Sequence, residues 1–292
     1  MQISKQSRFI DPFTDFGFKR IFGSEPNKDL LIDFLNAILA GERVIDDLVY
    51  DKTEHSGALP GDRKVIFDLL CTGVNGEQFI IEMQHIRQQY FKDRCLYYAC
   101  SLIRDQVPVS ITKWNYCLRP VYLIGIMDFC FDDSAHQDCI HRISLRYGSG
   151  EIFYEKLGFL YLEIPKFNKH AEELSSSADN WLYLLKHMNE MDKLPLFLRK
   201  PVFEKLFEIA EVSNLTKEEK MAYDASLKQQ RDWYATTEYL LKEGKKEGMQ
   251  VGKMEGILSA KLEMARKMKV KGLDDELIQE LTGLSAEQVR MA

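Results

Sequence analysis

Two carboxylates inside apolar segments constrain this sequence more than any other feature. Asp68 lies in KVIFDLLC (64–71) and Glu82 lies in FIIEMQ (79–84), and both segments have the composition of buried β-strands. An ionised carboxylate is rarely buried in a strand without a partner, because removing it from water costs several kcal/mol. The two segments therefore predict a compensated pair of acids, held either by cationic side chains or by a bound cation.

The turn between the two segments decides whether the acids share a face of the sheet. Glu82 and Gln84 do so in any register, because side chains along a strand alternate. A two-residue loop, 75–76, would pair residues whose numbers sum to 151 and would place Asp68 on the face opposite to Glu82. A three-residue loop, 74–76, would pair residues whose numbers sum to 150 and would set Asp68 directly opposite Glu82. The sequence is compatible with both loops.

In the second register, the two acids repel each other unless a divalent cation lies between them. Oxygen ligands with room for water are what Mg²⁺ prefers, and Mn²⁺ tolerates the same arrangement. The structural alternative is an ion pair with a basic residue of a neighbouring helix, for example Arg87 or Lys19. Both interpretations remain open at this point.

The remaining periodicity predicts an α/β fold with a mixed sheet. Leu30, Leu31, Phe34, Leu35 and Ile38 recur at helical spacing and predict a helix over 27–40, and a longer helix is expected over 88–106. An apolar run over 120–129 is typical of a central strand covered on both faces. Strands are expected at 44–50, 64–72, 78–84, 120–129, 141–146 and 159–164. Helices alternating with strands in this order indicate an α/β core.

The C-terminal part is predicted to be helical. Apolar stripes begin near residue 178, a further helix is expected from 217 to about 242, and two short helices are expected around the turn at 282–284. Four glycines at 244, 248, 252 and 256 predict a weak exposed helix or a hinge, or alternatively a ridge for close helix pairing. We expect three parts: a core over 1–175, a helical extension packed on it over 176–241, and a glycine-spaced basic segment with a helical tail over 242–292.

Composition limits the compartment and the partners. The N-terminus has no apolar stretch typical of a signal peptide, and no segment approaches the roughly 18 apolar residues of a membrane span, so we expect a cytoplasmic protein without a membrane partner. Six cysteines without a CxxC pair are typical of reduced thiols. The net charge of -6 argues against nonspecific coating of nucleic acid, but residues 242–271 hold nine Lys and Arg against four Glu and could contact phosphates locally.

The sequence resembles the PD-(D/E)XK nuclease superfamily, and specifically its transposase-associated branch, the Rpn-like recombination-promoting nucleases. The resemblance covers roughly residues 8 to 260. It rests on DPFTDFGFKRIFG at 11–23, FDLLC at 67–71, FIIEMQ at 79–84, the region 94–98, and EGKKEGMQVGKMEG at 243–256. It implies a restriction-endonuclease-like core, in which helices flank a mixed central sheet, followed by a C-terminal helical extension.

The resemblance also implies an activity and its residues. Asp68 and Glu82 match the two acids of the family's motif, as catalytic residues and metal ligands, and catalytic Gln84 stands where many members have lysine. The carbonyl of Met83 would help to ligate the metal, and Asp15 would be an outer acidic contributor. The activity implied is a metal-dependent DNA endonuclease that hydrolyses phosphodiester bonds, with Mg²⁺ or Mn²⁺ as cofactor, linked to transposition or recombination.

Position 84 departs from the commoner pattern. A lysine there supplies a positive charge near the attacking water, whereas an amide can only orient and weakly polarise that water. The partners expected are DNA and a second copy of the chain in a homodimer. The alternative is a catalytically inactive protein of the same fold that binds DNA or acts as an oligomeric scaffold.

Overall fold

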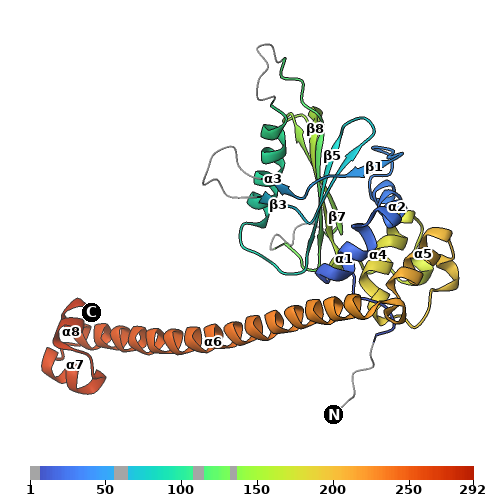
Figure 1. Cartoon of the computed structure of the whole chain (residues 1–292). Helices are drawn as coiled ribbons and strands as arrows, with labels where there is room; N and C mark the ends of the chain where they lie inside the picture. The colour runs from blue at the N-terminus through green and yellow to red at the C-terminus, as the bar shows by residue number, and fades with distance from the viewer. Residues whose placement is uncertain (1–6, 56–64, 108–114, 132–136) are drawn as a thin grey trace. The chain divides into compact units, whose positions relative to one another are not determined.

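A six-stranded mixed sheet lies at the centre of the first compact unit, residues 1–227, of the computed structural model (Figure 1). The structure describes residues 7–55, 65–107, 115–131 and 137–292. Strands β5, β6 and β8 are mutually parallel, and the other neighbours in the sheet are antiparallel. In spatial order the strands are β1 (Leu48–Tyr50), β4 (Leu69–Gly73), β5 (Gln78–Gln84), β6 (Val121–Met127), β8 (Ile152–Glu163) and β7 (Ile140–Arg146). The predicted mixed α/β sheet is therefore confirmed.

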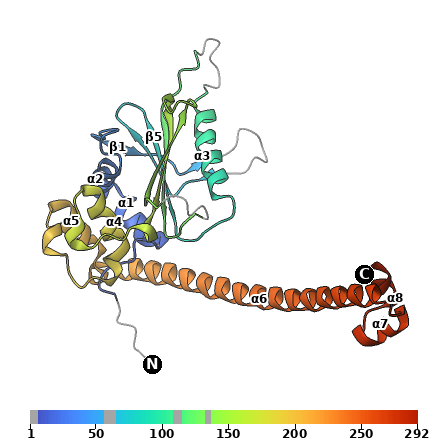
Figure 2. The same cartoon turned by 180° about the vertical axis from the view of Figure 1, so that it is seen from behind.

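Helices cover both faces of this sheet (Figures 1 and 2). One face carries α3 (Phe91–Asp105) alone among the α-helices described. The other face is covered by α1 (Asp15–Phe22), α2 (Lys28–Ile38), α4 (Ser177–His187) and α5 (Pro201–Ala210). These four helices converge on Trp181, whose ring centroid lies 5.7 Å from that of Phe22 and 5.5 Å from that of Phe34. Burial of such large aromatic side chains is a main source of stability in a core of this kind.

The two hydrophobic clusters explain why the central strands are apolar throughout. Side chains alternate along β5, so Phe79 and Ile81 join the cluster beneath α1 and α2, whereas Ile80 joins the cluster beneath α3. All seven residues of β6 are buried, which confirms the prediction of a central strand covered on both faces. Glu82 has the parity of Ile80 and therefore belongs to the α3 face.

Three predicted strands have different bounds in the structure. The strand expected over 64–72 is interrupted: β3 (Val65–Ile66) pairs with β2 (Glu54–His55), and β4 starts only at Leu69. Lys64 lies outside the described residues. The strand expected over 44–50 is shorter, and β8 begins earlier than residue 159, because its first half pairs only with β7, where one side stays exposed and the apolar pattern is weak.

A 54-residue helix, α6 (Lys217–Val270), begins in the first compact unit and continues into the second. The units comprise residues 1–227 and 228–292, and the predicted boundaries at 175 and 241 stay a prediction. In the first unit, the hydroxyl of Tyr223 accepts a hydrogen bond from the backbone N–H of Asp11 at 2.9 Å. The helix continues through residue 242, so the predicted helix end is wrong. Of the two structures predicted for the glycine-spaced segment, the exposed helix is confirmed and the hinge is wrong. Exposed glycine weakens a helix by only about 1 kcal/mol each, which a long helix tolerates.

Two short helices complete the second unit, as predicted. α7 (Asp275–Thr282) and α8 (Ala286–Met291) are separated by Gly283, whose φ of 65° suits glycine. Ile278, Leu284 and Val289 pack around Ala265 of α6 in a small core. A Cβ added at any of the four spaced glycines would meet nothing within 4 Å, so the proposed glycine ridge contacts no other described segment of this chain. Among the described residues, no helix is both long and apolar enough to cross a membrane.

Candidate active site

The β4–β5 hairpin has the register that brings the two acids together. Leu69 pairs with Ile81 and Cys71 with Phe79, so paired residue numbers sum to 150. The loop is the three-residue one, 74–76, and Gly76 has a φ of 82°. Of the two registers compatible with the sequence, the structure thus has the one in which Asp68, one residue before β4, faces Glu82.

Two reciprocal hydrogen bonds join the acids across the hairpin. The backbone N–H of Met83 donates to Oδ2 of Asp68 at 2.9 Å, and the backbone N–H of Asp68 donates to Oε1 of Glu82 at 3.2 Å. The second bond is possible because Asp68 lies at a bend, outside the β4 ladder, where its N–H is not used by a strand partner. The break in the predicted strand therefore positions the acid pair.

Burial and mutual repulsion both raise the pKa values of the pair. Burial is the largest cause for Asp68, and it outweighs the opposing effects of the Met83 hydrogen bond and the nearby charge of Lys19. Only 4% of Glu82 is exposed. Burial, followed by the charge of Asp68, raises the pKa of Glu82 to about 8. Two carboxylates this close cannot both ionise freely, so at neutral pH the pair retains a proton.

The structural alternative of a direct ion pair is not supported. Among the residues that the structure describes, no Lys or Arg side chain forms an ion pair with either acid. Lys19 instead pairs with Asp15 at 2.7 Å on the first turns of α1. Asp15 is exposed, and its charge raises the pKa of Asp68, which places it near the acid pair but outside it.

Gln84 and Met83 lie where the hairpin predicts, at the end of β5. Gln84 shares the face of Glu82, and its Oε1 accepts a hydrogen bond from Nη2 of Arg94 in α3. Sequence reasoning gave no role to Arg94. The available signal was a basic residue in the first turn of a helix, where the helix dipole favours acids.

Comparison with known families decides the relationship of the chain. A family model described as PD-(D/E)XK nuclease family transposase matches residues 12–239, more than three quarters of the sequence. The chain belongs to this family. The match confirms the predicted resemblance and includes α1, the acid pair and α3. Searches of curated proteins and of solved structures found no match.

Nucleases of the PD-(D/E)XK superfamily generally use divalent metal ions, and the acid pair of this chain suits one. Within the described ranges, no three His, Cys, Asp or Glu residues gather as a metal site. Magnesium, however, is commonly held by one or two carboxylates and several waters. The hydrogen bonds use Oδ2 of Asp68 and Oε1 of Glu82, and the other carboxylate oxygen of each accepts none from described residues. The donor set of the pair therefore fits a hard divalent cation.

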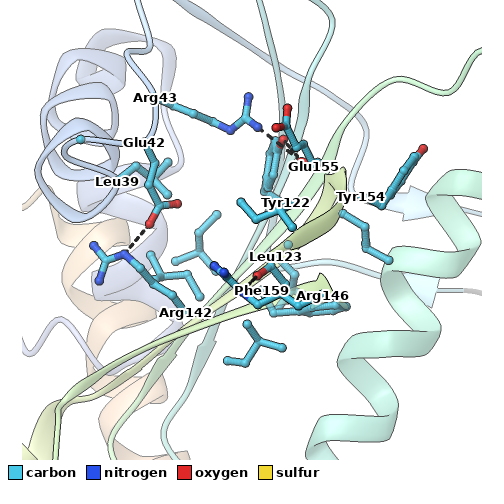
Figure 3. Close-up of a pocket in the computed structure, with 18 residues that line it drawn as sticks. Leu39, Glu42, Arg43, Tyr122, Leu123, Arg142, Arg146, Tyr154, Glu155 and Phe159 are labelled. Carbon is cyan, nitrogen blue, oxygen red and sulfur yellow. Dashed lines mark hydrogen bonds and ion pairs between the residues drawn. The ribbon is translucent and has the colours of Figure 1, made fainter. Parts of the chain in front are cut away.

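A pocket of about 440 Å³ lies elsewhere in the chain, at the end of α2 (Figure 3). Arg142 in its wall donates to Oε1 of Glu42 at 2.5 Å and to the carbonyl of Ile38 at 2.7 Å. The guanidinium of Arg43 lies 4.2 Å from the ring centroid of Tyr122. These charges are compensated within the protein, and the pocket contains neither acid of the hairpin, so we do not take it as the active site.

Proposed function

We propose that this chain is a metal-dependent DNA endonuclease that hydrolyses phosphodiester bonds. The observation that carries the proposal is the buried pair of Asp68 and Glu82, two like charges joined across a hairpin without a cationic side chain between them. Such an arrangement costs stability, and a bound divalent cation would reverse the cost. Membership in a nuclease family supports the same proposal.

Asp68, Glu82 and the carbonyl of Met83 would hold Mg²⁺, for which Mn²⁺ could substitute. The exposed Asp15 would act from an outer position through its charge. When bound, the cation would lower the pKa of a coordinated water and stabilise negative charge on the phosphate. Cation binding must displace the proton held by Glu82, so affinity should increase as the pH rises toward 8.

Gln84 would act on the attacking water rather than on the cation. It shares the face of Glu82, and a neutral amide cannot accept a proton at neutral pH, so it cannot serve as the general base. We assign it an orienting role in the transition state. The setting we propose is transposition or recombination of DNA, because the matching family is described as a transposase family. We keep the cytoplasm, expected from the sequence, as the proposed compartment.

Plasmid nicking tests the proposal. Purified protein should convert supercoiled plasmid to the nicked form with Mg²⁺ and not with EDTA. Asp68→Ala and Glu82→Ala should each abolish nicking while circular dichroism stays native, since each removes a cation ligand. Glu42→Ala in the pocket of Figure 3 is the matched control and should leave nicking intact. Full activity in either acid variant would contradict the assignment. DNA binding without cleavage by the wild type would instead identify an inactive protein of this fold.

The basic segment 242–271 is proposed to add affinity for DNA without adding chemistry. Because α6 is continuous, this segment would present its lysines along one helix that no hinge interrupts. Lys245, Lys246 and Lys253 are exposed on this helix. Contacts of such lysines with phosphates would be electrostatic and independent of sequence.

Changing these three lysines to glutamine should weaken DNA binding and reduce the slope of log K against log salt by up to about 3, at about 0.9 per lost phosphate contact. Cleavage at saturating DNA should change little. The competing role is the proposed homodimer. If α6 joined two copies, truncation after residue 241 would lower the mass measured by light scattering to less than half, because the dimer would separate and each chain would be shorter. An unchanged salt slope in the lysine variant would then favour dimerisation.

A further inference from the structure

Arg94 connects α3 to the end of β5 in the β4–β5 hairpin. Its backbone N–H donates to the carbonyl of Tyr90 at 2.9 Å in the first turn of the helix. Its guanidinium group donates from Nη2 to Oε1 of Gln84 and from Nη1 to Oε1 of Gln88. The same group lies 5.2 Å from the ring centroid of Phe91 and 5.7 Å from that of Tyr98, so two aromatic rings restrict its position.

The contact with Arg94 determines how the side-chain amide of Gln84 is oriented. A guanidinium group has five donors and no acceptor, so only the carbonyl oxygen of the amide can face it. Nε2 of Gln84 is then left as a donor, and it donates to no described residue. Arg94 therefore leaves Gln84 with an N–H group available to a ligand on the face of Glu82.

Arg94 also brings a permanent positive charge to this end of the sheet. Its charge favours the ionised forms of Asp68 and Glu82, against the larger opposing effect of burial. Its Nε is buried and has no hydrogen-bond acceptor among the described residues. A buried donor without an acceptor costs about 1–3 kcal/mol, so this placement is not optimal for stability alone.

We propose that Arg94 is a positioning residue that replaces the lysine missing from position 84. It holds Gln84 so that the amide presents a donor, as a lysine would, and it supplies the positive charge that glutamine lacks. The inference rests on the proposed endonuclease function. It differs from a purely structural role because it predicts that residues 84 and 94 compensate for each other.

A double-mutant cycle on the full chain tests the compensation. Arg94→Met and Gln84→Lys should each lower kcat for plasmid nicking by about 10- to 100-fold with KM nearly unchanged, which is the usual effect of losing a partner that orients an active-site group. Gln84→Lys alone should lower kcat because the positive charge of the lysine would be repelled by the positive charge of Arg94. The double variant should recover most of the lost kcat, because a lysine then stands at position 84 without that repulsion. Arg94→Lys should fall between wild type and Arg94→Met.

Arg104→Met is the matched control, on the same helix but paired with Asp105 at 2.9 Å, and it should leave kcat unchanged. A double variant no more active than Arg94→Met would overturn the proposal. It would also be overturned if Arg94→Met lowered kcat no more than Arg104→Met does.

A second measurement does not depend on activity. In the metal-free protein, the side-chain amide signals of Gln84 in a ¹⁵N correlation spectrum should shift in Arg94→Met and remain in place in Arg104→Met. Unchanged signals in Arg94→Met would overturn the proposed contact. If the wild type failed to nick plasmid, the endonuclease function would fail and with it the catalytic part of this inference, while the amide signals would still decide whether Arg94 holds Gln84.

Discussion

Two buried glutamates lie in one sheet with opposite surroundings. Glu163, at the end of β8, has no exposed surface and contacts Lys166 and the Nε2 of His141, the latter at 3.4 Å, while its Oε1 accepts a hydrogen bond from the N–H of Phe131 at 2.8 Å. Glu82, on β5, is almost as buried but faces Asp68, a second acid. One carboxylate is compensated by bases, and the other is opposed by an acid.

We infer from this difference that the partner, rather than burial, separates a structural acid from a functional one. A buried acid that contacts bases holds segments together, and its loss removes a charge that favours those bases in the folded state. A buried acid that faces another acid reduces the stability of the metal-free protein, and we explain its presence by cation binding. Glu163 would therefore be structural, and Glu82 functional.

The largest effect on stability is expected at Glu163. Glu163→Ala removes the carboxylate that Lys166 and His141 share, and both of these side chains are mostly buried. The free energy of unfolding at pH 7 should fall by about 3–5 kcal/mol, which is the usual cost of breaking a buried ion pair. Urea denaturation measures it. A loss below about 1 kcal/mol, the range of an exposed pair, would contradict a structural role for Glu163.

Replacing Glu82 is expected to raise the free energy of unfolding rather than lower it. The pKa of Glu82 is about 8 in the folded protein and near 4.5 in the unfolded chain, so the folded state binds more protons between these values. Stability of the wild type in EDTA should therefore decrease as the pH rises from about 4.5 to about 8. Glu82→Gln keeps the shape and an acceptor for the Asp68 N–H but cannot ionise. It should be more stable than wild type at pH 8.5 by about 2 kcal/mol or more, at about 1.4 kcal/mol per pKa unit.

Urea denaturation at pH 5 and pH 8.5 separates the two cases. The difference between Glu82→Gln and wild type should be small at pH 5 and large at pH 8.5. The control is Glu42→Gln, an exposed acid paired with Arg142, which should show no such dependence on pH. Parallel pH profiles for wild type and Glu82→Gln would mean that Glu82 carries no excess proton in the folded state.

A smaller effect, on kcat rather than on stability, is expected at Gln84. This residue lies next to the acid pair but is neutral. Gln84→Ala should lower kcat by about tenfold or more, equivalent to about 1.4 kcal/mol, because an orienting amide acts in the transition state. The affinity for Mg²⁺ should be unchanged, since Gln84 is not a proposed ligand. Equal losses of kcat and of Mg²⁺ affinity would instead make Gln84 a ligand or a structural support.

Much of the hairpin was predictable because short-range rules determine it. The apolar composition of FIIEMQ predicted the strand that the structure has at Gln78–Gln84, and the Asn75-Gly76 turn restricted the register to two choices. Local sequence could not choose between these two registers. β4 is apolar on both faces, since Leu69 and Cys71 join one hydrophobic cluster and Leu70 joins the other, so either register would bury it.

Arg94 and α6 show two further limits of sequence reasoning. The contact between Arg94 and Gln84 depends on how α3 crosses the sheet after the left-handed Tyr90, which residue spacing does not encode. In α6, spaced glycines suggested a break because glycine disfavours helices, but the charged and apolar residues between them are good helix formers. The family was recognisable from the motifs, whereas the roles of the site residues remain predictions.

Binding of Mn²⁺ in the absence of DNA tests the central claim most directly. Titration calorimetry of the full chain at pH 7.5 should show binding by the wild type, with release of protons, because the cation replaces the proton on Glu82. Glu82→Gln should lose this binding, whereas Glu163→Gln, once shown to be folded by circular dichroism, should retain it. Equal Mn²⁺ affinity in wild type and Glu82→Gln, or loss of binding only in Glu163→Gln, would contradict the account.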